Sequence, residues 1–263
     1  MPSDLSIVDA FSDRPFAGNP AGVCVLDSPR PDDWMQRVAA EVNLSETAFL
    51  QFNGAEFGLR WFTPQTEVDL CGHATLASAH VLWSEGRWPN GTPIRFRTRG
   101  GLLGAEQDGD VIELDFPALA VRPCDPPEGL AESLKVPLAF VGNYKLDYLC
   151  EVADEAALRA LQPDFALLKA VKTRGLVVTC KASDGEFDFL SRFFAPAVGI
   201  DEDPVTGSAH CALAPYWAAR LGRNELNGYQ ASRRGGAVRV RVLGDRVRLG
   251  GKAVTVIRGR LDA

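Results

Sequence analysis

The 263-residue sequence is poor in the residues from which metal sites and disulfide frameworks are usually built. It contains three histidines and six cysteines, and no two cysteines form a Cys-x-x-Cys pair. The histidines also lack the Cys/His spacing of zinc-binding modules. We therefore expect reduced thiols, a cytoplasmic location and no bound metal.

Positive charge is also scarce relative to negative charge: the sequence has 28 Lys and Arg but 34 Asp and Glu, so the formal net charge is −6. A broad surface for nucleic acid is therefore not expected. No apolar stretch approaches the length that crosses a membrane, and the first residues lack signal-peptide character, so we expect no membrane partner. A hydrophobic share of 46% instead indicates globular structure, with enough chain for two domains.

A weak internal repeat organises this chain. Gly72 and Gly207 each open an apolar run rich in small residues, and each is preceded by a strand-like segment that ends at a proline, Pro64 or Pro196. The two prolines and the two glycines are separated by nearly the same number of residues. This spacing predicts two pseudo-equivalent halves.

Both apolar runs predict helices that protein must surround. Ala74–Trp83 and Ala209–Leu221 are apolar on every face, and strand-like sequence lies on both sides of each. The fold class that follows is α+β, with two repeated domains that each roll a mixed β-sheet around a central helix. Pro215 should kink the second helix or end its first segment.

Prolines gather after residue 116 and mark the expected linker. We therefore expect one domain over residues 1–117 and another over 118–263, with the last strand able to return to the first. Periodicity predicts helices from Pro31 and over Glu155–Leu161. It predicts strands at Ser6–Phe11, Val23–Leu26, Thr47–Phe52, Leu59–Phe62, Ile94–Thr98, Leu102–Glu106, Val111–Phe116, Ala139–Gly142, Tyr148–Val152, Leu176–Cys180, Phe187–Phe194, Val238–Leu243, Val247–Leu249 and Ala253–Leu261.

An acidic segment lies directly before the predicted start of the second helix. Asp201–Asp203 supplies three carboxylates, and Thr206–Ser208 leads into the helix. Ser208 can cap the first turn, and the free N–H groups of that turn favour an anion. Carboxylates here can perform acid–base work, but an ordinary acidic loop before a capped helix is an equally good interpretation.

Two residues of the first half are further candidates. Glu46 lies where a helix gives way to an apolar strand, and His73 follows Gly72 at the start of the first helix. A buried carboxyl group or an imidazole can exchange a proton near neutral pH. The alternatives are an exposed turn residue for Glu46 and a packed or capping imidazole for His73.

Six short motifs, spread over residues 9–208, form a specific combination: Asp9-Ala10-Phe11, Gly18-Asn19-Pro20, Asn43-Leu44-Ser45-Glu46-Thr47, Phe62-Thr63-Pro64, Gly72-His73, and Glu202-Asp203 through Thr206-Gly207-Ser208. With them, the sequence resembles the PhzF-like isomerases of phenazine biosynthesis, within the diaminopimelate-epimerase fold group. The resemblance implies an active site between two domains, proton transfer without a cofactor, a small carboxylate substrate and a homodimer.

The same resemblance assigns roles to individual residues. It implies that Glu46 is the proton shuttle, and that His73, Asp203 and Ser208 complete the catalytic set. The substrate-binding residues that it implies come from the same motifs, and they are Asn19, Ser45, Gly72, Thr206 and Gly207.

Three other functions remain open. A two-thiol racemase needs a cysteine at both helix starts, whereas this chain has Cys71 at one and Thr206 at the other. A Ser–His hydrolase would have to use Ser208 and His210, which are too close along one helix to face each other. A catalytically silent binding protein on the same scaffold is the third alternative.

Overall fold

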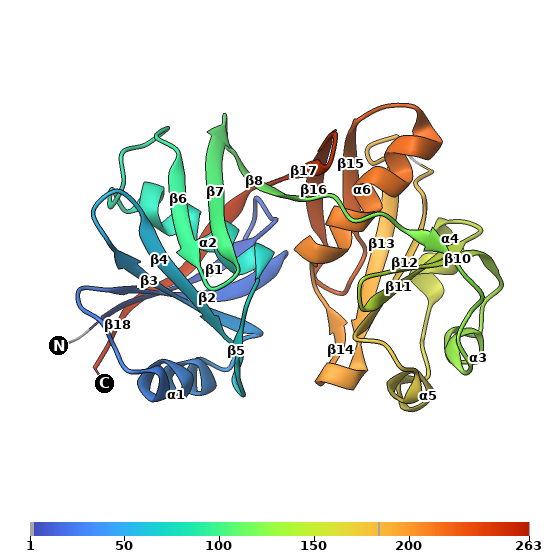
Figure 1. Cartoon of the computed structure of the whole chain (residues 1–263), viewed down its shortest axis with the longest axis horizontal. Helices are drawn as coiled ribbons and strands as arrows, with labels where there is room; N and C mark the ends of the chain where they lie inside the picture. The colour runs from blue at the N-terminus through green and yellow to red at the C-terminus, as the bar shows by residue number, and fades with distance from the viewer. Residues whose placement is uncertain (1–2, 184, 263) are drawn as a thin grey trace. The chain divides into compact units, whose positions relative to one another are not determined.

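The structure is a computed structural model, and it describes residues 3–183 and 185–262. The chain divides into two compact units (Figure 1). The first consists of Met1–Phe116 together with Leu249–Ala263, and the second consists of Pro117–Arg248. No helix among the described residues is long and apolar enough to span a membrane.

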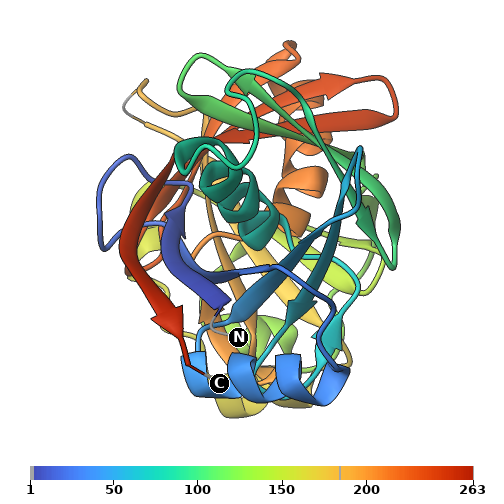
Figure 2. The ribbon, with the colours of Figure 1, turned by 90° about the vertical axis from the view of Figure 1, so that its left-hand side faces the viewer.

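The first unit contains a mixed sheet whose strands pair in the order β18-β1-β2-β3-β4-β6-β7-β8. The β2/β3 and β4/β6 pairs are parallel, and the other pairs are antiparallel. Figure 2 shows β18 beside β1 at one side of this unit. The bounds of the strands are β1 Ser3–Ala10, β2 Asn19–Leu26, β3 Glu46–Phe52, β4 Phe57–Phe62, β5 Glu67–Val68, β6 Ile94–Thr98, β7 Gly101–Asp108, β8 Val111–Pro117 and β18 Ala253–Leu261.

Helix α2, Gly72–Ser84, lies inside the first unit, and the strands curve around it (Figure 2). It packs against β1, β2, β3 and β18, and nearly all of its residues are buried. Helix α1, Asp32–Val42, lies outside the sheet and buries only Met35, Val38 and Ala39. The uniform apolar character of α2 and the single apolar stripe of α1 account for these two positions.

The second unit repeats the same pairing scheme. Its strands follow the order β10-β11-β12-β13-β15-β16, in which β11/β12 and β13/β15 are the parallel pairs. The bounds are β9 Arg122–Pro123, β10 Leu138–Tyr144, β11 Asp147–Val152, β12 Gly175–Lys181, β13 Phe189–Ala195, β14 Ile200–Asp203, β15 Glu225–Gln230 and β16 Gly236–Leu243. Strand β17, Arg246–Gly251, begins in this unit and ends in residues of the first. Alternation of antiparallel and parallel pairs is therefore common to both units.

Helix α6, Gly207–Leu221, occupies the place in this scheme that α2 has in the first unit, since each helix lies in the chain between the strands of a parallel pair. Of the two expectations for Pro215, a kink or an end of the first helical segment, the second is wrong, because one helix continues through this residue. Pro215 has no N–H for the carbonyl of Cys211, but that carbonyl accepts a hydrogen bond of 3.0 Å from the backbone N–H of Leu119. The helix therefore continues to a glycine cap at Gly222.

Most strands that the periodicity predicts are present, and β6 and β18 have the predicted bounds. The pattern missed elements that are short or largely polar: β5, β9, β14, β15, and two small helices, α3 at Leu130–Leu134 and α5 at Phe165–Ala170. The predicted helix at Glu155–Leu161 is α4, Glu155–Ala160. Short elements contain too few residues to show a period.

Candidate functional site

In the first unit, Glu46 and His73 lie side by side. Glu46 is the first residue of β3, and His73 is the second residue of α2. The Nε2 atom of His73 is 3.4 Å from the Glu46 Oε2 atom and 3.4 Å from the Ser45 hydroxyl oxygen. The side chain of Glu46 is only 15% exposed. Two residues far apart in sequence thus form a largely buried acid–imidazole pair.

Asn19 contacts the other nitrogen of the imidazole ring, Nδ1. It is the first residue of β2, it is fully buried, and its amide Nδ2 lies 3.3 Å from the His73 Nδ1 atom. When the amide donates to Nδ1, the ring hydrogen lies on Nε2 and faces Glu46. Because β2 and β3 are paired in register, with Ala21 opposite Glu46, these side chains lie at one end of the sheet.

Cys71 completes this group. It is the N-cap residue of α2, its side chain makes no cap hydrogen bond, and its Sγ atom is 3.5 Å from His73 Nδ1 and 4.0 Å from Nε2. The thiol also forms a hydrogen bond with the Glu46 carboxyl group. We call Glu46, Cys71 and His73 the acid–thiol–imidazole cluster.

Burial sets the electrostatics of this cluster. It raises the pKa of Glu46 above its ordinary value, and hydrogen bonds from Ser45 and Cys71 oppose part of that shift. A carboxyl group whose pKa moves toward neutrality can both accept and return a proton near physiological pH. The geometry therefore suits a single group that acts as base and then as acid.

In the second unit, Asp203 and Thr206 form a compact loop before α6. The Thr206 hydroxyl donates to the Asp203 carboxylate, and Thr206 is the N-cap residue of the helix. Gln230, which is fully buried, accepts from the Thr206 backbone N–H at 2.8 Å and donates to the Asp203 carbonyl oxygen at 2.7 Å. Gln230 therefore fixes the loop, a role that no local pattern indicated.

The prediction that Ser208 caps α6 is wrong, because Ser208 is the second residue of the helix. Its hydroxyl instead accepts a hydrogen bond of 3.3 Å from Arg174. Arg174 also forms a two-pronged ion pair with Asp147, whose side chain is almost completely buried. This pair raises the pKa of Arg174, so the guanidinium stays charged beside Ser208.

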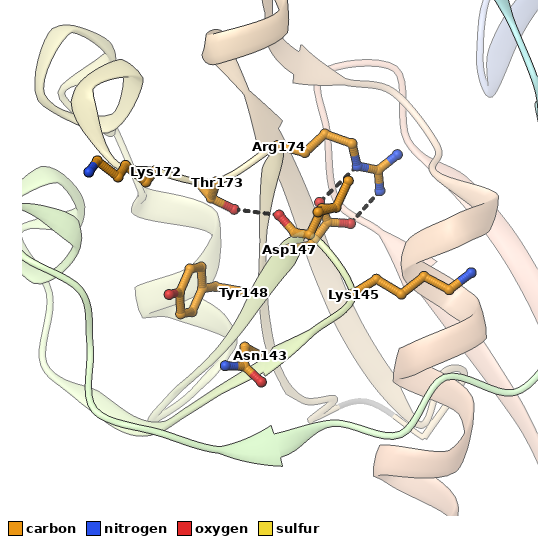
Figure 3. A pocket seen from close by; sticks show the side chains of 8 residues that line it. Asn143, Lys145, Asp147, Tyr148, Lys172, Thr173 and Arg174 are labelled. Carbon is orange, nitrogen blue, oxygen red and sulfur yellow. Dashed lines mark hydrogen bonds and ion pairs between the residues drawn. The ribbon is translucent and has the colours of Figure 1, made fainter.

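A cavity of about 360 Å³ adjoins this ion pair (Figure 3). Asp147 and Arg174 form one side of it, and Figure 3 shows Lys145 and Arg174 extending in the same general direction. The other lining residues are Asn143, Leu146, Tyr148, Lys172 and Thr173. Lys145, Lys172 and Arg174 outnumber Asp147, the one carboxylate of the lining, so the residues around this cavity carry a net positive charge. The sequence motifs missed Asp147 and Arg174, which lie in segments that no motif covers.

Glu202 and His210 have structural contacts. Arg192 binds both carboxylate oxygens of Glu202, at 2.7 and 3.0 Å. His210 is fully buried, and its Nδ1 lies 2.9 Å from the Thr206 carbonyl oxygen. Burial lowers the pKa of His210 to about 4. The His210 imidazole is neutral and contacts a carbonyl oxygen next to its own helix, so it is poorly suited to act as a base for Ser208. This disfavours the Ser–His hydrolase.

The structure therefore collects the predicted residues into two groups, one in each unit. Asn19, Ser45, Glu46 and His73 meet in the first unit, with Gly72 as the first residue of α2. In the second unit, Asp203 and Thr206 meet at the start of α6, where Gly207 and Ser208 are the first two helical residues. None of the six cysteines, all of which lie among the described residues, forms a disulfide bond.

Comparison with known proteins gives consistent similarities. The family model described as phenazine biosynthesis-like protein, PhzC-PhzF, matches residues 8–259. A protein from Halalkalibacterium halodurans, named an uncharacterized isomerase, is 51% identical over 262 residues, which are 99% of each chain. A crystal structure of a PhzF family protein from Enterococcus faecalis is similar with a TM-score of 0.96 and 38% identity over 100% of both chains.

A more distant similarity concerns the fold alone. A hydroxyproline epimerase from Agrobacterium vitis, solved with bound trans-4-hydroxy-L-proline, has a TM-score of 0.67 and 13% identity, and the similarity covers 99% of this chain and 92% of that one. Together with the PhzF structure, it confirms the predicted class, an α+β fold of epimerase-like sheets around central helices.

Proposed function

Because the chain belongs to the phenazine biosynthesis-like PhzF family of isomerases, we propose that it moves a proton within a small carboxylate-bearing substrate without a cofactor, and that Glu46 is the general acid and base. The observation that carries this proposal is the contact between the buried Glu46 carboxyl group and the His73 imidazole, at 3.4 Å. Isomerisation needs one group that removes a proton and returns it elsewhere on the same molecule.

Each step of the proposed reaction uses a group of the first unit. The ionised Glu46 carboxylate takes a proton from a substrate carbon, and the electron pair of that C–H bond spreads into the adjacent unsaturated or carboxylate system. The protonated Glu46 then delivers the same proton to a different carbon or face. His73 holds a hydrogen on Nε2 toward Glu46, and Asn19 keeps that tautomer in place.

The second unit has a group of donors of its own that suits an anion, at the start of α6. Ser208 and the first N–H groups of α6 can donate to a carboxylate, and the charged Arg174 beside Ser208 adds a favourable field. Asp203 and Thr206 hold the backbone at the start of the helix. Fixed donors of this kind are preorganised to hold a carboxylate.

A deuterium-exchange experiment tests the role of Glu46. The protein is incubated in D₂O with a panel of small cyclic and amino carboxylates, and incorporation into each compound is followed by NMR. Glu46→Gln keeps the shape and hydrogen bonding of the side chain but cannot accept a proton. We expect exchange of the active compound to fall about 10²–10⁴-fold while its binding, measured by calorimetry, changes little.

Glu41→Gln is the matched control, because Glu41 is an exposed glutamate at the end of α1 and its variant should exchange at the parental rate. If Glu46→Gln also exchanges at that rate, Glu46 is not the shuttle. The contact of Cys71 with His73 would then favour a thiol base, as in a cysteine-type racemase, and Cys71→Ser would be the variant to measure.

A further inference from the structure

We propose that the acid–thiol–imidazole cluster binds one thiophilic divalent metal ion such as Zn²⁺. The bound ion blocks proton transfer, because it occupies the side chains that would carry the proton. The binding half of this proposal stands on the geometry of Glu46, Cys71 and His73. The inhibitory half rests on the proposed function.

The three side chains supply one sulfur, one nitrogen and one oxygen ligand. Their ligand atoms all lie within 4.8 Å of one another. Within residues 3–183 and 185–262, this is the one group of three or more such side chains that could hold a metal. Carboxylate, imidazole and thiolate are the ligands that Zn²⁺ takes in proteins.

The distances approach those of a tetrahedral site. Zinc–ligand bonds of about 2.0–2.3 Å place neighbouring ligand atoms roughly 3.3–3.6 Å apart. The Nε2 atom of His73 is already 3.4 Å from the Glu46 Oε2 atom, and it is 4.0 Å from the Cys71 Sγ atom. The Glu46 and Cys71 ligand atoms lie within 4.8 Å of each other, so adjustments of these two side chains would complete three ligand positions.

The fully buried Asn19 provides the outer contact that a metal-bound histidine needs. Such a histidine usually donates its other ring N–H to an oxygen, which fixes the ring and its tautomer. The Asn19 amide lies 3.3 Å from the Nδ1 atom of His73. When the amide turns, its oxygen accepts from Nδ1–H and the lone pair of Nε2 faces the metal.

Metal and proton compete for the same groups. On binding, the Cys71 thiol releases its proton to solvent and its sulfur forms the metal bond, while the Glu46 carboxylate and the His73 Nε2 lone pair bind the ion instead of a proton. The fourth position would be left to water or a substrate oxygen. A protein with this ion in place could bind a carboxylate but could not move a proton.

Cadmium is the probe for the experiment, because a cadmium–thiolate bond gives a charge-transfer absorption in the ultraviolet. Chelator-treated protein is titrated with Cd²⁺ alone, and we expect the band to saturate at one ion per chain. Cys71→Ser should abolish the band. The matched control is Cys124→Ser, which removes a partly exposed thiol outside the cluster and should leave the titration unchanged. Circular dichroism establishes that each variant is folded.

The remaining two ligands and the outer contact are tested by affinity. Glu46→Gln and His73→Asn each remove one ligand and should weaken Cd²⁺ binding at least about 10-fold, while Asn19→Ala should weaken it by about 10–100-fold through the histidine. A band that survives Cys71→Ser, or one that disappears in Cys124→Ser, would overturn the assignment of the site.

Inhibition is measured separately, with Zn²⁺ in the deuterium-exchange assay. We expect exchange to fall as Zn²⁺ fills the site and to recover when a chelator is added. Cd²⁺ binding with the expected pattern of variants, but without inhibition by Zn²⁺, would overturn only the inhibitory half. Normal exchange by Glu46→Gln would instead overturn the proposed function and leave the metal site intact.

Discussion

The starts of α2 and α6 show how one scaffold can position two different kinds of chemistry. Both helices begin with a glycine after an extended cap residue, Cys71 or Thr206, and in neither does the cap side chain bond to the helix. His73 follows the first cap by two residues and contacts side chains outside its helix. His210 follows the second cap by four residues and binds the carbonyl of that cap residue.

Position within the first helical turn decides the role of each imidazole. At the second helical residue, the side chain of His73 can leave the helix and meet Asn19 and Glu46 from β2 and β3. At the fourth, His210 points back along its own helix, which is where a side chain one turn later is directed. Its ring packs near Phe189 in the core. The same residue type thus contacts a carboxyl group in one unit and packs in the core of the other.

The largest expected effect separates the two histidines. His73→Asn should reduce deuterium exchange about 10²–10⁴-fold, because it removes the imidazole that contacts the Glu46 carboxyl group. Its melting temperature should change little. His210→Asn should do the reverse, with exchange close to parental and a lower melting temperature. Equal losses of exchange in the two folded variants would contradict the comparison.

The ion pair of the second unit should matter mainly for stability and binding. Arg174→Gln leaves the buried Asp147 carboxylate without its charged partner, which should cost about 3 kcal/mol of unfolding free energy. Urea unfolding measures this loss. Arg192→Gln, which breaks the Arg192–Glu202 pair, is a comparison variant: it should lose stability but keep carboxylate affinity, whereas Arg174→Gln should lose both.

A pH-dependent loss of stability should come from His210. Its folded-state pKa is about 4, whereas an unfolded histidine titrates near 6.5, so the unfolded state binds more protons between these values. Stability is fully present above pH 6.5 and falls as the pH drops toward 4, by about 3 kcal/mol. His210→Gln should show a smaller loss over this range in urea unfolding at several pH values. An unchanged slope would exclude His210 as its source.

The smallest expected effect concerns the proline that α6 has and α2 lacks. Pro215→Ala restores a backbone N–H that competes with Leu119 for the Cys211 carbonyl. The gain in helix propensity and the loss of the Leu119 contact oppose each other, so unfolding free energy should change by no more than about 1 kcal/mol. Hydrogen exchange at the Leu119 amide should become faster. An unchanged rate would mean that this contact does not protect the amide.

The sequence alone determined the class of fold and the family. The two helices that begin at Gly72 and Gly207 are apolar on every face, so they can be stable only when protein encloses them. The local amino-acid composition is enough to predict this requirement. Strands such as β6 and β18 followed from local periodicity in the same way. The ordered motifs around Glu46, His73 and Ser208 supplied the family because they depend only on residue identity.

Tertiary structure alone decided which of those residues meet. The contact of Glu46 with Cys71 and His73 depends on how β3 pairs with β2 and on how α2 enters the sheet, and neither is encoded in a window of neighbouring residues. The same holds for Arg174, Asp147 and Ser208, which come from three separate segments. Periodicity reports which face of an element is buried, but the register between distant elements fixes which side chains touch.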